Sequence, residues 1–320
     1  MNAYESLKRD ARWKWWEPAI LLVLIGVPLA MGKYSLVNEI VITALFAVSL
    51  DLILGYAGIV SLGHAAFFGL GAYASALFAK HVHPDPLIGL AVGTACATVL
   101  GAVASATIIR GSDLTRLMVT IGVGLLMLEL ANKLDWLTGG ADGLQGVVMG
   151  PLLGQFEFDL YGKTAAWYSL CALVVCLVLA RRLVHSPFGA TLKAIRDNRL
   201  RATAIGIPVT SRLAVIYTIS AGVAGVAGGL LAQTTGFASL DVFEFHRSAD
   251  LVLMLVIGGT GWLYGGIIGA VVFKVLQEQL SAFTPQYWMF WIGLLLVILV
   301  LVGRERINPR YWMKKKEGSA

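Results

Sequence analysis

Long apolar segments alternate with short polar ones along most of the chain, and this pattern predicts a bundle of membrane-spanning helices. About 20 apolar residues cross the hydrocarbon core of a bilayer as an α-helix. The runs at 249–263 and 264–283 form one long apolar stretch that is interrupted by glycines, so together they are also compatible with a re-entrant hairpin. The predicted fold is an all-α integral membrane protein with about ten transmembrane helices, some of them short or interrupted by glycine. The runs fall at 18–32, 36–54, 59–79, 87–109, 114–131, 164–180, 213–235, 249–263, 264–283 and 286–302.

The composition agrees with a polytopic membrane protein. Of the 320 residues 58% are hydrophobic and only 14% are charged, and the mean hydropathy is +0.76. The net charge of +6 does not indicate a nucleic-acid partner. Most lysines and arginines lie in segments between spans that the predicted crossings place on the same side of the membrane. By the positive-inside rule these segments and both termini face the cytoplasm. The predicted parts are an N-terminal arm at 1–17, a membrane domain at 18–302 that contacts lipid, an external loop at 131–163, a cytoplasmic loop at 181–212 and a basic tail at 303–320.

Motifs of enzymes and of metal centres are absent from the sequence. Cys96, Cys171 and Cys176 fall within predicted spans and lack the paired spacing of a zinc site, so they are expected to be small core residues. The chain has no Gly-x-x-x-x-Gly-Lys-Ser/Thr loop and no cluster of catalytic type. We therefore expect a protein that is not an enzyme and that holds neither a metal nor a cofactor.

A glycine-rich run from Gly55 to Tyr73 lies where the pattern predicts membrane helices, although glycine lowers helix stability. In lipid, interrupted backbone persists only where protein covers it or where it lines a cavity. The glycines at 258–261 form a second such break. Both breaks are candidates for the wall of a solute path, and static close packing of helices is the alternative. The candidate path residues are Asp51, Gly55, Gly58, Ser61, His64, Phe68, Gly69, Gly258, Gly259 and Gly261.

Ionisable side chains within the predicted spans are further candidates, because a charge in the hydrocarbon core is unfavourable and faces protein or water. Asp51 and His64 flank the first break, where exposed amides are suited to a carboxylate. For His64, an interior hydrogen bond is the more ordinary role. The other such residues are Glu129, Asp250, Lys274 and Glu278.

The cytoplasmic loop at 181–212 carries seven basic residues and a single acid. Proline and glycine at its ends predict a pair of short helices within 187–208. Leu192, Ile195 and Leu200 would form an apolar face, which suits a groove on a soluble partner. Anchoring to anionic lipid is the alternative reading, since it explains the charges.

Several separated motifs resemble one family when their order and spacing are taken together. They are Gly-Tyr-Ala-Gly-Ile-Val-Ser-Leu-Gly-His from residue 55, Thr-Gly-Gly-Ala-Asp-Gly-Leu from 138, Ala-Ile-Arg-Asp-Asn from 194, Ala-Gly-Val-Ala-Gly-Val-Ala-Gly from 221 and Val-Ile-Gly-Gly-Thr-Gly from 256. They resemble the membrane-spanning permease subunits of ABC importers for branched-chain amino acids and related small polar solutes. The resemblance covers roughly residues 38–303.

The resemblance implies one subunit of a larger importer in the bacterial inner membrane. Its partners would be a second, homologous permease subunit, two cytoplasmic ATPases that use ATP, and an external solute-binding protein. The basic loop would then contain a cytoplasmic coupling helix that inserts into an ATPase. The coupling residues implied in this way are Gly189, Lys193, Ala194, Arg196, Asp197, Ala202, Ala204 and Gly206.

Asp51 departs from the family pattern, which often has asparagine at this position. A carboxylate there conflicts with a purely neutral path unless it is protonated or paired. The alternative function is a stand-alone ion-coupled carrier that uses Asp51, Glu129 or Lys274. A membrane-embedded enzyme is a weaker alternative, because it needs a cluster of acids, bases or metal ligands that the sequence does not offer.

Overall fold

The structure is a computed structural model that describes residues 32–159 and 161–283, with Gly26 and isolated positions at 285–287, 290–291, 293–294 and 297. The arm at 1–17, the basic tail and the predicted spans at 18–32 and 286–302 lie wholly or largely outside the described residues. The chain divides into two units, residues 1–270 and 271–320. The second unit is represented mainly by the later turns of α13 (Leu263–Phe283).

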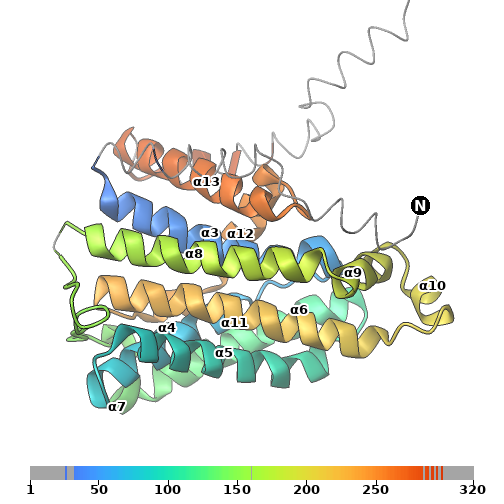
Figure 1. Ribbon diagram of the computed structural model, residues 1–320, viewed down its shortest axis with the longest axis horizontal. Helices are drawn as coiled ribbons and strands as arrows, with labels where there is room; N and C mark the ends of the chain where they lie inside the picture. The colour runs from blue at the N-terminus through green and yellow to red at the C-terminus, as the bar shows by residue number, and fades with distance from the viewer. Residues whose placement is uncertain are drawn as a thin grey trace, which may run out of the picture. The chain divides into compact units, whose positions relative to one another are not determined.

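The described residues are almost entirely helical (Figure 1). Within them, β pairing is limited to two isolated bridges. In the part of the chain that the structure describes, six helices are long and apolar enough to cross a membrane: α3, α5, α6, α8, α11 and α13. The all-α membrane fold is therefore confirmed, while the count of ten helices stays a prediction. The helices are α3 (Tyr34–Ala57), α4 (Ala65–His81), α5 (Pro86–Ile108), α6 (Asp113–Lys133), α7 (Asp135–Thr138), η1 (Gly140–Asp142), α8 (Lys163–Val184), α9 (Pro187–Asp197), α10 (Arg199–Ala204), α11 (Val209–Thr235), η2 (Leu240–Phe243), α12 (Phe245–Gly258) and α13.

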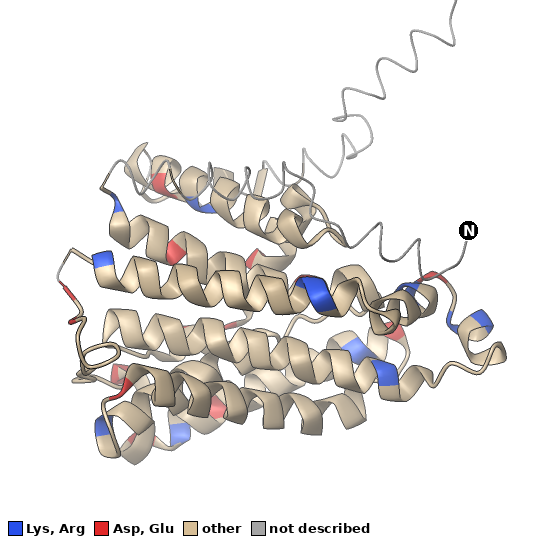
Figure 2. Cartoon of the chain, viewed as in Figure 1, with Lys and Arg blue, Asp and Glu red and all other residues tan. Residues whose placement is uncertain are grey.

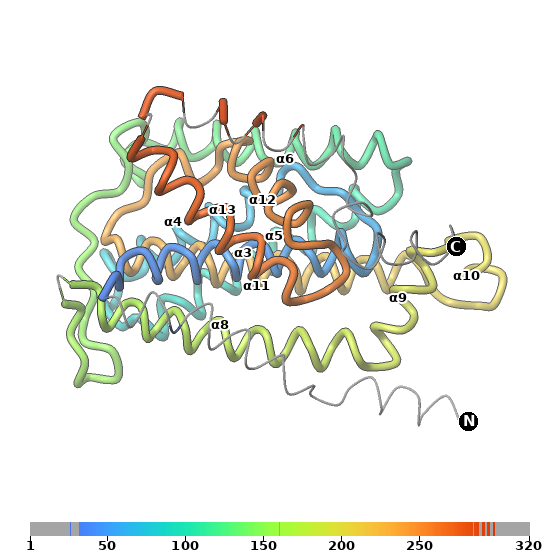
Figure 3. Tube along the Cα trace, turned by 90° about the horizontal axis from the view of Figure 1, so that it is seen from above, coloured from blue at the N-terminus to red at the C-terminus, as the bar shows by residue number. Residues whose placement is uncertain are grey.

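Helix α3 lies at the centre of the first unit, and most of its residues are buried. It contacts α8 on one side and α11 on another, and α11 in turn packs against α4 and α5. Figures 1 and 3 show α8 running along α3, and α5 packs against α11. Most residues of α5, α6 and α8 stay outside the core of the isolated chain, so these helices present apolar faces to lipid or to another subunit.

Glycines allow α4, α5 and α11 to approach each other closely. A Cβ at Gly228 would overlap the backbone carbonyl of Phe68, and a Cβ at Gly71 would overlap the backbone of Gly225. Side chains at these points would separate the helices. Close packing thus accounts for these glycines without any role in transport.

Helix α4 begins later than the apolar pattern predicts. The predicted span starts at residue 59, but residues 58–64 leave α3 at Gly58 and turn back along it. The Nε2 of His64 lies 2.9 Å from the Oγ of Ser49. Ser49 is about 12 Å before the end of α3, at a rise of about 1.5 Å per residue. Helix α4 therefore starts inside the bundle.

Helix α12 begins at the same depth as α4. The backbone N–H of Ala65, the first residue of α4, donates to the Oγ of Ser248 in the first turn of α12 at 2.9 Å. α12 ends at Gly258, and only a short turn separates it from α13. The predicted spans at 249–263 and 264–283 thus correspond to a short helix that begins in the interior and a longer helix that follows it.

Candidate functional site

The two glycine-rich breaks contact each other near the end of α3. Asp51 is fully buried on α3, and its Oδ1 accepts a hydrogen bond from the backbone N–H of Gly261 at 2.8 Å. Gly261 has a φ of +75°, a conformation that favours glycine. Gly55 lies so close that a Cβ on it would overlap the backbone of Gly261. Asp51 therefore holds the turn between α12 and α13 against the last turns of α3.

The other glycines predicted for the path also lie at close contacts. A Cβ at Gly258 would overlap the carbonyl oxygen of Gly265 in the first turn of α13. Gly259 has a φ of +104° and ends α12. Gly69, on α4, lies under the ring of Phe243.

Helix α9 lies directly on the contact between the two breaks. The Nη1 of Arg196 donates to the carbonyl oxygen of Gly55, and the two atoms are 2.5 Å apart. The same side chain covers Gly58, where an added Cβ would come within 2.9 Å of the Cγ of Arg196. The Nζ of Lys193 lies 5.7 Å from the ring centroid of Tyr56, within the range of a cation–π interaction. Two residues of the basic loop thus contact the end of α3.

Local sequence explains how α9 reaches this position. Ser186 caps the helix by accepting the N–H of Gly189, and Pro187 occupies the first turn. Leu192 and Ile195 are fully buried and hold α9 against the bundle. Leu192 and Ile195 do share an apolar face, but that face packs against the membrane helices of this chain, so the prediction that it enters a groove on a partner is wrong for these two residues.

Helix α10 projects beyond the ends of α8 and α11 (Figure 1). Asn198 caps it by accepting the N–H of Arg201 at 2.9 Å, and Ala202 anchors it as a buried residue. Leu200, predicted to share the apolar face of α9, is instead 85% exposed, because the break at Asn198 turns α10 away. The turn after α10 exposes Ile205 and places Gly206 at a φ of +84°.

The remaining predicted coupling residues lie around this α9–α10 segment. Ala194 is half-buried, whereas Asp197 and Ala204 are exposed. Figure 2 shows basic residues on α9, on α10 and on the adjoining ends of α8 and α11. The segment therefore presents an apolar tip, Leu200 and Ile205, within a basic surface.

Three predicted path residues, Ser61, His64 and Phe68, are buried within the chain. The ring of His64 stacks on Phe46, and its Nε2 meets Ser49 as described above. His64 thus makes the interior hydrogen bond that is its more ordinary role. Contact of these three residues with a solute stays a prediction.

The other ionisable residues are spread over the fold. Glu129 is exposed on α6 and pairs with Lys133, with 3.5 Å between its Oε1 and the lysine Nζ. Asp250 lies on α12, and Lys274 and Glu278 lie on the later turns of α13, which belong to the second unit. Glu129 is therefore a surface residue and not part of the contact around Asp51.

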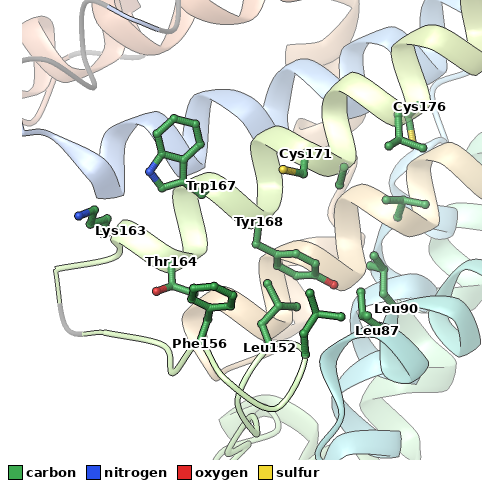
Figure 4. A pocket seen from close by; sticks show the side chains of 14 residues that line it. Leu87, Leu90, Leu152, Phe156, Lys163, Thr164, Trp167, Tyr168, Cys171 and Cys176 are labelled. Carbon is green, nitrogen blue, oxygen red and sulfur yellow. The ribbon is translucent and has the colours of Figure 1, made fainter.

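A large groove runs along α8, opposite Leu87 and Leu90 of α5 (Figure 4). It has a volume of about 810 Å³, and Val226 of α11 contributes to its lining. Lys163 and Thr164 lie at one end, beside Trp167, and the rest of the lining is almost wholly apolar. Such a lining offers few partners to the charged groups of a small polar solute, so the groove is a poor candidate for the solute path.

The structure also draws attention to residues that the sequence analysis did not single out. Asp241, Glu244, His246 and Arg247 lie together at η2 and the start of α12. All four lie between the predicted spans at 213–235 and 249–263. The sequence signal that would have found them is the apolar run at 249–263, which is shorter than the about 20 residues that cross a bilayer and is preceded by charged residues.

The comparisons with known proteins decide the family. The family described as the permease component of branched-chain amino acid transport systems matches residues 34–300. The chain belongs to this family. The permease is also 27% identical to the high-affinity branched-chain amino acid transport system permease protein LivM of Salmonella typhimurium, over 94% of this chain and 77% of the relative. It is 26% identical to LivM of Escherichia coli over the same shares.

More distant relatives carry other names. The fructose import permease protein FrcC of Rhizobium meliloti is 24% identical, over 72% of this chain and 62% of the relative. No solved structure matches the permease significantly. The resemblance stated from the motifs is confirmed: the chain is a permease subunit of an ABC importer, a multi-pass protein of the bacterial inner membrane, and not an enzyme.

Proposed function

We propose that this permease forms the translocation path for branched-chain amino acids in an importer driven by partner ATPases. Its two LivM relatives are named for this class of solute and match nearly the whole chain. In the proposed assembly a second permease subunit completes the path, an external binding protein delivers the solute, and ATP is bound by the partners and not by this chain. Both termini and the loop at 181–212 face the cytoplasm, in keeping with the basic residues of that loop.

The α9–α10 segment is proposed to transmit the movement of an ATPase to the membrane helices. The observation that carries this role is the hydrogen bond between Arg196 and Gly55, because it joins the exposed segment to the glycine-rich breaks. The apolar tip, Leu200 and Ile205, would enter a groove on the ATPase. Anchoring to anionic lipid is less well supported, because it explains the basic charges of the segment but not its contact with α3.

The test of the solute is reconstitution of the permease with its ATPases and binding protein in liposomes, followed by uptake of labelled leucine, isoleucine, valine and fructose. We expect saturable uptake of the three amino acids that requires ATP, with no uptake of fructose. Fructose uptake would contradict the proposed solute. Leucine uptake by the permease alone would instead support the ion-coupled carrier.

The test of coupling is Leu200→Glu, which places a charge on the apolar tip. We expect uptake to be lost because burial of an unpaired carboxylate in the ATPase groove is unfavourable. Val148→Glu is the matched control, since Val148 is 75% exposed and lies in the predicted external loop. Leu200 is a better target than Ala202, which is buried, so that its substitution would disturb folding. Normal uptake by Leu200→Glu would refute docking through the tip.

A further inference from the structure

The segment between α11 and α12 runs into the helix bundle. Near the end of α11 it pairs with the external loop, where the N–H of Leu144 donates to the carbonyl of Ala238 at 2.7 Å. A few residues later, Phe243 stacks on Tyr73 of α4 with their ring centroids 5.5 Å apart. Ser248 then meets the first residue of α4. Gln145, next to Leu144, accepts a hydrogen bond from the Nζ of Lys80 near the end of α4, so the segment runs along α4 from its last turn to its first residue.

The depth of this segment follows from its contacts with α6. Phe243, Phe245 and Ser248 line a small pocket together with Ile121 and Leu125 of α6. These two α6 residues lie at least about 12 Å from either end of the helix, at about 1.5 Å per residue. A hydrocarbon core is about 30 Å thick. The start of α12 is therefore close to the middle of the membrane.

Four ionisable side chains gather at this depth and remain partly open on the surface of the chain. Their side chains are between 34% and 50% exposed. Arg247 forms an ion pair with Asp241, with its Nε 3.1 Å from Oδ2, and the Nδ1 of His246 lies 2.8 Å from the Oε2 of Glu244. Exposure of such groups to lipid is unfavourable, so they face water or another protein chain.

We propose that Asp241, Glu244, His246 and Arg247 line the translocation path and bind the two charged ends of a zwitterionic solute. Asp241 and Glu244 would receive the ammonium group, and Arg247 and His246 the carboxylate. Both signs of charge are present within a few residues, as a free amino acid requires. In the structure Arg247 pairs with Asp241, and His246 pairs with Glu244. A zwitterion offers a new partner to both signs of charge, whereas a metal ion would take the carboxylates and leave Arg247 without one. This inference rests on the proposed function.

The first test measures access of water to this region. In the reconstituted importer, with Cys96, Cys171 and Cys176 replaced by alanine, Phe245→Cys is treated with a water-soluble thiol reagent. Val99→Cys is the matched control, since Val99 lies midway along α5 and is 64% exposed on an apolar face. We expect labelling of Phe245→Cys alone, in at least one state of the ATP cycle, and slower labelling when leucine is supplied with the binding protein. Equal lack of labelling at both positions would overturn the proposal.

The second test removes one charge at a time and reads uptake. With saturating loaded binding protein, Glu244→Gln should lower the maximal rate of leucine uptake at least about tenfold, as expected for the loss of a charged hydrogen bond. Glu129→Gln is the matched control, because Glu129 pairs with Lys133 on the surface of α6. Normal uptake by Glu244→Gln would overturn the binding role while leaving the proposed function intact. If the unmodified importer takes up no amino acid, it is the proposed function that fails.

Discussion

The link between Arg196 and Gly55 makes a quantitative prediction about coupling. Arg196→Ala removes the donor to the Gly55 carbonyl and the side chain that covers Gly58. A hydrogen bond to a charged group contributes about 1.5–3 kcal/mol. The side chain of Arg196 is 40% exposed, so we take the lower end of that range. A loss of about 1.5 kcal/mol corresponds to about a tenfold change in the equilibrium between the joined and separated positions of α9 and α3.

The assay measures leucine uptake and phosphate release in the same proteoliposomes. In Arg196→Ala we expect ATP hydrolysis to continue, while the number of leucine molecules transported per ATP hydrolysed falls about tenfold. This factor corresponds to the loss of about 1.5 kcal/mol from the contact between α9 and α3. Arg196→Lys keeps a charge but not the planar guanidinium, so it should restore only part of the coupling.

The control is Arg201→Ala, which removes the same charge from the same loop. Arg201 forms hydrogen bonds through its backbone: its N–H donates to Asn198 and its carbonyl oxygen accepts from the N–H of Ile205, and both bonds survive the substitution. If the loop served only to anchor anionic lipid, the two alanine variants would behave alike. Equal coupling ratios in Arg196→Ala and Arg201→Ala would therefore refute the link between α9 and α3.

Three further predictions concern stability, measured by thermal unfolding of the purified permease. Asp51→Leu leaves the partly buried N–H of Gly261 without its acceptor and should destabilise the protein by about 1–3 kcal/mol, whereas Asp51→Asn keeps an acceptor and should change stability little. Gly228→Ala should destabilise by about 1–3 kcal/mol because its Cβ meets the carbonyl of Phe68. Gly122→Ala should raise stability by up to about 1 kcal/mol, since its Cβ has open space on a helix. Unchanged melting of Asp51→Leu and Gly228→Ala, or destabilisation by Gly122→Ala, would contradict these contacts.

Helix positions were largely predictable because long apolar runs have few ways to satisfy their backbone in lipid. The runs at 36–54, 87–109, 114–131 and 213–235 became α3, α5, α6 and α11 with shifts of a few residues. The predicted start of the span at 59–79 was wrong, because α4 begins only at Ala65. Apolar residues continue through 58–64, and hydropathy alone does not distinguish a membrane helix from an apolar segment that lies against another helix.

The candidate site was predictable only in parts. Both glycine-rich breaks and the basic loop stand out in the sequence as separate features. Their contact does not, because Asp51, Arg196 and Gly261 are brought together from distant parts of the chain. The charges at Asp241 and Glu244 were placed outside the membrane because charged residues next to an apolar run usually mark its end.

The sequence by itself determined the membrane environment, the helical fold and the family, since these depend on composition, on the length of apolar runs and on motif order. The tertiary structure decided which residues meet. It placed the starts of α4 and α12 side by side inside the bundle and joined the basic loop to both glycine-rich breaks. The physical reason is that buried backbone groups at a helix break need partners, and those partners come from segments far away along the chain.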